Sequence, residues 1–135
     1  MREILFHGKR ADNGEWVEGD LLQTRYHSGH IEYQIMPQTP VSSAYPVLSE
    51  TVGQYTGLTD KNGVRIFEGD ICRFKRFNDI HVGEIVFNVT TASFVMRYQS
   101  IVGVYGEKAT HKMLLSACDN IEIIGNIHDN PELLR

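Results

Sequence analysis

A chain of 135 residues can bury a hydrophobic core without disulfides or metals, so we expect a single β-rich domain over residues 1–135. Apolar residues make up 41% and charged residues 22%, which excludes a disordered chain, and the net charge of -4 excludes a general attraction to nucleic acid or anionic lipid. With only Cys72 and Cys118 and no apolar run long enough for a signal peptide or a membrane span, we expect a cytosolic protein with reduced thiols and no membrane partner.

Two segments, 6–21 and 55–71, share one pattern. FHGKRADNGEWVEGDL and YTGLTDKNGVRIFEGDI each begin with an aromatic residue and a nearby Gly, continue through Asn-Gly, and end in Glu-Gly-Asp before an aliphatic residue. Asn-Gly favours tight turns, and Gly-Asp supplies a permissive backbone followed by a carboxylate that can accept N–H groups. Each copy therefore predicts a strand, a turn, a strand and a sharp corner, with Gly19 and Gly69 at positions tolerant of positive φ.

The segment 21–36, LLQTRYHSGHIEYQIM, predicts a β-hairpin with a two-residue turn at Ser28-Gly29. Strand alternation then separates an apolar face from a polar, charge-matched face. The predicted cross-strand pairs are Tyr26 with Ile31, Thr24 with Tyr33 and Leu22 with Ile35 on one face, and Arg25 with Glu32 and Gln23 with Gln34 on the other.

A second hairpin is predicted over 82–99, VGEIVFNVTTASFVMRYQ, centred on Thr90-Thr91. Because Thr-Thr is a poor tight turn, we expect a four-residue loop in the same register. The pairs are then Phe87 with Phe94, Ile85 with Met96, Glu84 with Arg97, and Gly83 with Tyr98, whose ring would cover the glycine gap.

The end of the chain is less regular. The segment 108–118, KATHKMLLSAC, fits a short helix or a strand. In HDNPELLR, Asn130 can cap a helix that begins at Pro131, so a short C-terminal helix is expected. The predicted fold class is mainly β, an antiparallel curled sheet or partly open barrel of about seven to nine strands built from short hairpins.

The segment TVGQYTGLTDKNGVRIFEGDI, followed by a β-hairpin and closed by IEIIGNIHDNPELL, resembles the YopX family of small phage and prophage proteins. The resemblance runs from FHGKR to NPELL, and residues 37–48 fit the pattern least. It implies a phage or prophage origin and a β-rich fold. It brings no established activity and no assigned functional residues.

Two groups of residues are candidates for metal chemistry. Glu18, Asp20, Glu68 and Asp70 form a carboxylate set, but each pair straddles a turn glycine, which favours solvated or N–H-capping roles. His27 and His30 flank the Ser28-Gly29 turn and could share a zinc ion, yet no third ligand stands at a recognisable spacing. We therefore expect no metal and no cofactor.

The segment RFKRF, residues 73–77, is a basic cluster with interleaved aromatic residues, a composition that suits single-stranded nucleic acid. Alternation places Cys72 and Phe74 on the core face and Arg73, Lys75 and Phe77 on the other, with Arg76 adding a third cation. Three cations on an acidic chain favour a solvated strand face. Cys72 is expected to be a core thiol rather than a nucleophile.

No common nucleotide-binding or hydrolase signature is found in the sequence. We therefore expect a non-catalytic protein that acts through contacts with a host or phage protein, or as a homo-oligomer through exposed strand edges. Single-stranded nucleic-acid binding through 73–77 is the first alternative, and a carboxylate-dependent metal enzyme is the second.

Overall fold

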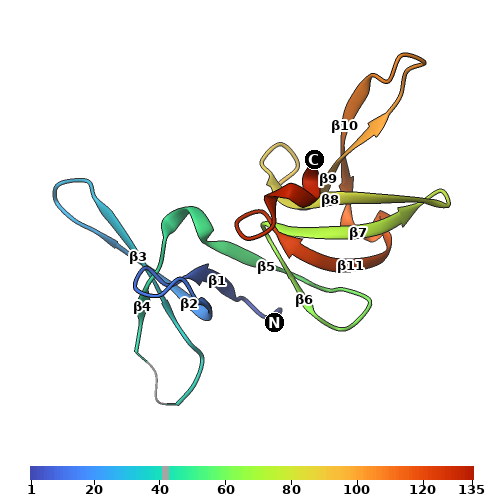
Figure 1. Ribbon diagram of the computed structural model, residues 1–135. Helices are drawn as coiled ribbons and strands as arrows, with labels where there is room; N and C mark the ends of the chain where they lie inside the picture. Colours follow the sequence, from blue (N-terminus) through green and yellow to red (C-terminus); the bar gives the residue numbers. More distant parts are fainter. Residues whose placement is uncertain (41–42) are drawn as a thin grey trace. The chain divides into compact units, whose positions relative to one another are not determined.

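The computed structural model describes residues 1–40 and 43–135 and is almost entirely β (Figure 1). These residues form two compact units, Met1–Gly57 and Leu58–Arg135. Among them, no helix has the length and apolar character needed to cross a membrane. The prediction that 1–135 fold as a single domain stays a prediction.

The N-terminal unit is built from antiparallel strands around a small core of Leu5, Ile35 and Val47. The strand order of its sheet is β4-β3-β2-β1-β5-β6, and β1 pairs with Gly53 and Gln54 of β5. The last residues of β5 and all of β6 belong to the Leu58–Arg135 unit. The elements are β1 Phe6–Lys9, β2 Trp16–Arg25, β3 Ile31–Met36, β4 Tyr45–Pro46, the 3-10 helix η1 Ser49–Thr51, β5 Gly53–Thr59 and β6 Arg65–Phe67.

The C-terminal unit contains an antiparallel sheet in the order β10-β9-β8-β7-β11. Its strands are β7 Asp70–Arg76, β8 Asp79–Asn88, β9 Ser93–Ile101, β10 Lys108–Leu114 and β11 Asp119–Asn126, with 3-10 helices η2 Leu115–Ala117 and η3 Pro131–Leu134. One face buries a core cluster that includes Cys72, Phe74, Ile85, Met96 and Tyr98. Alternation along the strands leaves the opposite face with charged and aliphatic side chains.

The mainly β, antiparallel class is confirmed, but the curled sheet or partly open barrel is wrong. Both sheets are open, with β4 and β6 ending one and β10 and β11 ending the other. The C-terminal helix is only a 3-10 turn, Pro131–Leu134. The side chain of Asn130 does not cap it and instead accepts a hydrogen bond from the N–H of Asn126 in β11. The ambiguous segment 108–118 is mostly strand, β10, followed by η2.

The β2–β3 hairpin forms, but the predicted register is wrong by one residue. Leu21 faces Ile35 and Thr24 faces Glu32. The reason is the turn. The Tyr26 N–H donates a hydrogen bond to the His30 carbonyl, and the Tyr26 carbonyl accepts one from the Gly29 N–H, which closes a three-residue loop, 27–29, in which Gly29 adopts φ 89°. A glycine in this left-handed conformation completes a three-residue hairpin loop, whereas the prediction assumed a two-residue one.

The β8–β9 register is confirmed. Phe87 faces Phe94, Ile85 faces Met96, Glu84 faces Arg97 and Gly83 faces Tyr98, around a four-residue loop that follows Asn88. Strand alternation and the length of the loop predict the same register in this hairpin, so the local sequence pattern was sufficient to define the pairing.

The two Glu-Gly-Asp segments do not share one conformation, which corrects the repeat interpretation. Gly69 lies in the turn between β6 and β7 with φ 93°. Gly19 lies inside β2, outside the positive-φ residues, at the point where β2 passes from pairing with β1 to pairing with β3. A Cβ atom at Gly19 would overlap the carbonyl group of Met36. A glycine is therefore required at position 19 because the backbone of Met36 approaches it closely, and not because of a positive φ.

Candidate functional site

His27 and His30 are exposed at the tip of the β2–β3 hairpin. The ring of His30 stacks on Tyr26, with centroids 5.8 Å apart. Within residues 1–40 and 43–135, no three His, Cys, Asp or Glu side chains are grouped as a metal site requires. The absence of an essential metal stays a prediction, and metal analysis of protein purified without chelator or affinity tag would test it. Stoichiometric zinc that is lost in His27→Ala would contradict it.

Asp20 and Asp70 lie in different compact units and have separate structural roles. The exposed Asp20 accepts a hydrogen bond of 2.7 Å from the side-chain amide of Gln38. The buried Asp70 accepts a hydrogen bond of 2.8 Å from the backbone N–H of Phe67 across the Gly69 turn. The second carboxylate thus stabilises the turn that contains it.

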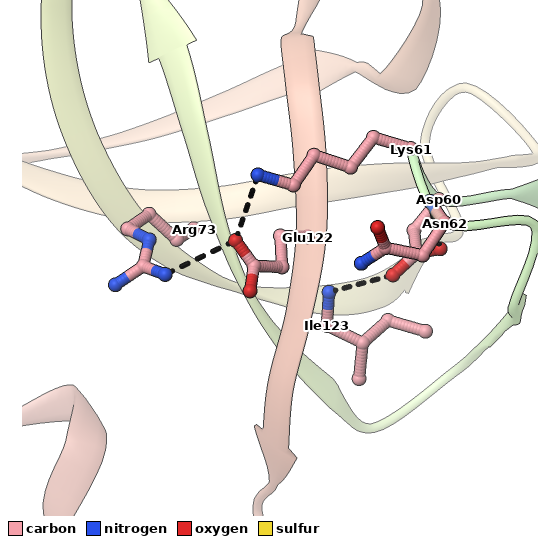
Figure 2. A network of polar contacts seen from close by, with 6 residues as sticks. All are labelled: Asp60, Lys61, Asn62, Arg73, Glu122 and Ile123. Carbon is pink, nitrogen blue, oxygen red and sulfur yellow. Dashed lines mark hydrogen bonds and ion pairs between the residues drawn. The ribbon is translucent and has the colours of Figure 1, made fainter.

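Arg73 belongs to an ion-pair network between β7, β11 and the β5–β6 turn (Figure 2). Arg73 Nη2 and Lys61 Nζ each lie 3.0 Å from Glu122 Oε2. The hydrogen bond from Lys61 and that from Arg73 both lower the pKa of Glu122. Arg73 therefore already has an anionic partner within the unit.

Alternation predicted that Phe77 lies on a strand face beside Arg73 and Lys75, and this prediction is wrong. Phe77 and Asn78 form the turn between β7 and β8, with φ 50° and 67°. The Phe77 side chain is 82% exposed, and the guanidinium carbon of Arg76 lies 4.5 Å from its ring centroid. Arg76 Nη1 also contacts Met113 Sδ at 3.0 Å. The basic cluster is therefore divided between a sheet face and a hairpin tip.

Asp60 accepts hydrogen bonds from three backbone N–H groups, a role that was not predicted from the sequence. Its Oδ1 atom accepts hydrogen bonds from the N–H groups of Asn62 at 2.9 Å and Val64 at 3.0 Å. Its Oδ2 atom accepts one from the N–H of Ile123 at 3.1 Å (Figure 2). Burial alone would raise the pKa of Asp60, but these three N–H donors lower it below its ordinary value. An Asp directly before Lys-Asn-Gly is an Asx-turn signal that could have revealed the first two bonds.

Both cysteines are buried and free. Desolvation strongly raises the pKa of Cys72, and it raises the pKa of Cys118 to about 11. A nucleophilic cysteine needs a lowered pKa and access to solvent. These thiols are core residues.

Exposed apolar side chains gather at the tip of the β9–β10 hairpin, which projects from the rest of the C-terminal sheet (Figure 1). Ile101 is 70%, Val102 61%, Val104 93% and Tyr105 90% exposed. We call these residues, 101–105, the hairpin tip. Four large apolar side chains within five residues are therefore exposed to water, which solvates them poorly.

The fold and these surfaces define a small all-β protein with two antiparallel sheets. A family model described as YopX protein matches residues 5–135, and the chain therefore belongs to the YopX family. The crystal structure of protein EF1440 from Enterococcus faecalis is similar to it over 100% of both chains, with 24% sequence identity and a TM-score of 0.47. None of the curated proteins matches the chain.

Proposed function

We propose that the protein is a non-catalytic binding protein of phage or prophage origin, which acts in the host cytoplasm through protein–protein contacts made by the hairpin tip. The exposure of the apolar side chains in 101–105 is the observation that carries the proposal. Apolar surface stabilises an interface by about 25 cal/mol per Å² when water leaves it. Clusters of this kind on a protein surface mark interaction sites.

Hydrogen bonds within the loop fix the conformation of the hairpin tip in the absence of a partner. Glu107 accepts a hydrogen bond of 3.1 Å from the N–H of Tyr105, and its backbone carbonyl accepts one of 2.9 Å from Val102. Gly106, with φ 82°, allows the chain to turn between them. A preorganised loop loses less conformational entropy on binding. This order supports its use as a contact surface.

The test compares a hairpin-tip variant with a control variant, both made by replacing exposed apolar residues with serine, in quantitative affinity capture from host cells read by mass spectrometry. Val104→Ser with Tyr105→Ser removes the apolar tip, whereas Val89→Ser changes a valine that is 82% exposed in the β8–β9 loop. We expect a protein partner, or the protein's own copies, to be retained by wild type and Val89→Ser and lost by the tip variant. Sedimentation velocity separates self-association from a foreign partner. Identical partners and sedimentation for all three proteins would contradict the proposal.

Single-stranded nucleic-acid binding is the alternative that one observation favours. The exposed ring of Phe77, with Arg76 beside it and Lys75 on β7, could stack one base near two cations. Arg73 is engaged with Glu122, which weakens the case. The carboxylate-dependent metal enzyme gains no support, because Asp20 and Asp70 act as separate hydrogen-bond acceptors.

A further inference from the structure

A groove of about 630 Å³ lies on the face of the C-terminal sheet opposite the core cluster. Strands β8, β9 and β10 form its floor, and the turn η3, which packs on β8, forms a wall. All of its lining residues belong to the Leu58–Arg135 unit. Of the hairpin tip, Ile101 lines the groove, whereas Val104 and Tyr105, the residues changed in the hairpin-tip variant, do not, and neither does the β7–β8 turn.

An ion pair crosses the floor of the groove. Arg97 donates from Nη2 to Glu84 Oε1 between the facing strands β8 and β9. The Glu84 side chain is 12% exposed, while that of Arg97 is 46% exposed. Since a guanidinium group has five N–H donors and this bond uses one, Arg97 can donate hydrogen bonds to a second carboxylate.

The remaining lining combines aliphatic side chains with cations. Ile80, Val82, Ile101, Leu133 and Leu134 supply apolar contacts, and Lys108 and Arg135 stand with Arg97 as basic groups. Glu84 is the acidic side chain of this lining. In a molecule of net charge -4, the groove is therefore locally positive.

The neighbouring edge strand adds to this charge. Lys112 on β10 faces Arg97 on β9, an arrangement of like charges that by itself destabilises the sheet. Among the described residues, Lys108 and Lys112 have no acidic partner. An incoming acidic segment would offset these charges.

We propose that this groove is a second binding site, adjoining the hairpin tip at Ile101, that takes an extended acidic segment of a partner protein carrying alternate apolar side chains. The segment lies along the groove on the face of the sheet, places carboxylates near Arg97 and Lys108, and inserts aliphatic side chains between Ile101 and Leu134. Successive side chains of an extended segment point to opposite sides, so its carboxylates and its aliphatic side chains can contact different parts of the lining. Aliphatic walls favour peptide over nucleic acid, because bases bind by stacking on exposed aromatic rings and the lining tyrosine, Tyr98, is buried in the core.

The test titrates wild-type protein with a fluorescent peptide of about eight residues that alternates Glu and Leu, which spans roughly 25 Å when extended. Two matched peptides replace Glu by Gln or Leu by Ser. We expect saturable binding of the Glu-Leu peptide in the micromolar range, weakened by salt, and at least about tenfold weaker binding of each matched peptide. An oligo-dT strand of similar length is titrated alongside.

Lys108→Glu and Leu134→Ser locate the site, and Arg25→Glu is the control, with the same charge change on an exposed strand of the N-terminal unit. Circular dichroism verifies that each variant is folded. We expect about tenfold weaker peptide binding for Lys108→Glu and Leu134→Ser, and unchanged binding for Arg25→Glu. The proposal is overturned if the peptide does not saturate, if Arg25→Glu weakens it equally, or if oligo-dT binds more tightly. Loss of the hairpin-tip partner has no bearing on this result, so the two sites fail separately.

Discussion

At the scale of single residues, Gly19 and Gly69 show that one short motif can be required for two physical reasons. Gly69 needs its positive φ, and the nearest atom to an added Cβ there is Ile127 Cγ1 at 3.8 Å, an ordinary contact. Gly19 needs the absence of a Cβ, because the Met36 carbonyl occupies that space. The identical letters therefore conceal a conformational constraint in one copy and a steric one in the other.

This difference predicts opposite tolerance to asparagine, which adopts positive φ more readily than other residues. Gly69→Asn should retain more stability than Gly69→Val, whereas Gly19→Ala and Gly19→Asn should both lower the free energy of unfolding by about 1–3 kcal/mol through overpacking. Urea unfolding followed by Trp16 fluorescence reports on Gly19, since Trp16 is the single tryptophan and lies on the same strand. Circular dichroism reports on Gly69. Full tolerance of Ala at Gly19 would contradict the steric explanation.

Asp60 should make the stability of the C-terminal unit depend on acid pH. Because its pKa is lowered in the folded state, its stabilisation is present above the unfolded pKa of about 3.9 and is lost as pH falls through the folded value. In Asp60→Asn the amide oxygen can still accept from Asn62 and Val64, but the amide NH₂ group, a donor, faces the N–H of Ile123. The free energy of unfolding should therefore fall by about 1–3 kcal/mol near pH 7. Unfolding between pH 3 and 7 tests this. Asp12→Asn, whose carboxylate pairs with Arg10 at the surface, is the control and should have a small effect.

At the scale of elements, the β7–β8 turn holds a bulky aromatic residue in a conformation that favours Asn or Gly. Left-handed φ at Phe77 costs about 1–2 kcal/mol relative to extended or right-handed backbone. Phe77→Asn with Asn78→Gly supplies the preferred two-residue hairpin turn and should raise Tm by several degrees. Phe77→Leu removes the ring but keeps the strain, so it should not raise Tm. A lower Tm for the Asn-Gly variant would show that contacts of Phe77 outweigh the strain.

The two long hairpins also show how turn geometry controls pairing. Both β2–β3 and β8–β9 have clear alternation, yet the first register was mispredicted because three residues form its loop, with Gly29 in the left-handed region. Shifting a register by one residue exchanges the two faces of a strand. In β8–β9, the pairs of Ile85 with Met96 and Glu84 with Arg97 were both recoverable from the pattern.

At the scale of the whole molecule, the acidic charge predicts poor binding to single-stranded nucleic acid. We expect dissociation constants no tighter than about 10⁻⁴ to 10⁻⁶ M at physiological salt. If Arg73, Lys75 and Arg76 contacted phosphates, their replacement would flatten the log-log salt slope by about 0.7 per contact. Fluorescence anisotropy at several salt concentrations measures both quantities. Nanomolar affinity abolished by these replacements would instead establish the nucleic-acid alternative.

The candidate sites were predictable to different degrees. RFKRF was visible as a basic cluster, but the turn at Phe77 and the Arg73–Glu122 pair were not, because Glu122 reaches Arg73 only through the pairing of β11 with β7. The Asp60 site likewise joins Asp60 to Ile123, 63 positions away. The hairpin tip was absent from the prediction, since an apolar segment such as IVGVY is read as buried unless its surroundings are known.

The sequence by itself determined the β character, the two Asn-Gly turns and the turn at Gly69, the core placement of Cys72 and Phe74, and the β8–β9 register. These depend on alternation and turn chemistry among residues close in the chain. Tertiary structure alone decided that β11 pairs with β7 and that both sheets are open. It also decided that Asn130 accepts a hydrogen bond from Asn126 instead of capping a helix, and that the Met36 carbonyl occupies the space where Gly19 would carry a Cβ. These features depend on contacts between segments that are distant in the chain. A local sequence pattern does not contain the free energies of such contacts.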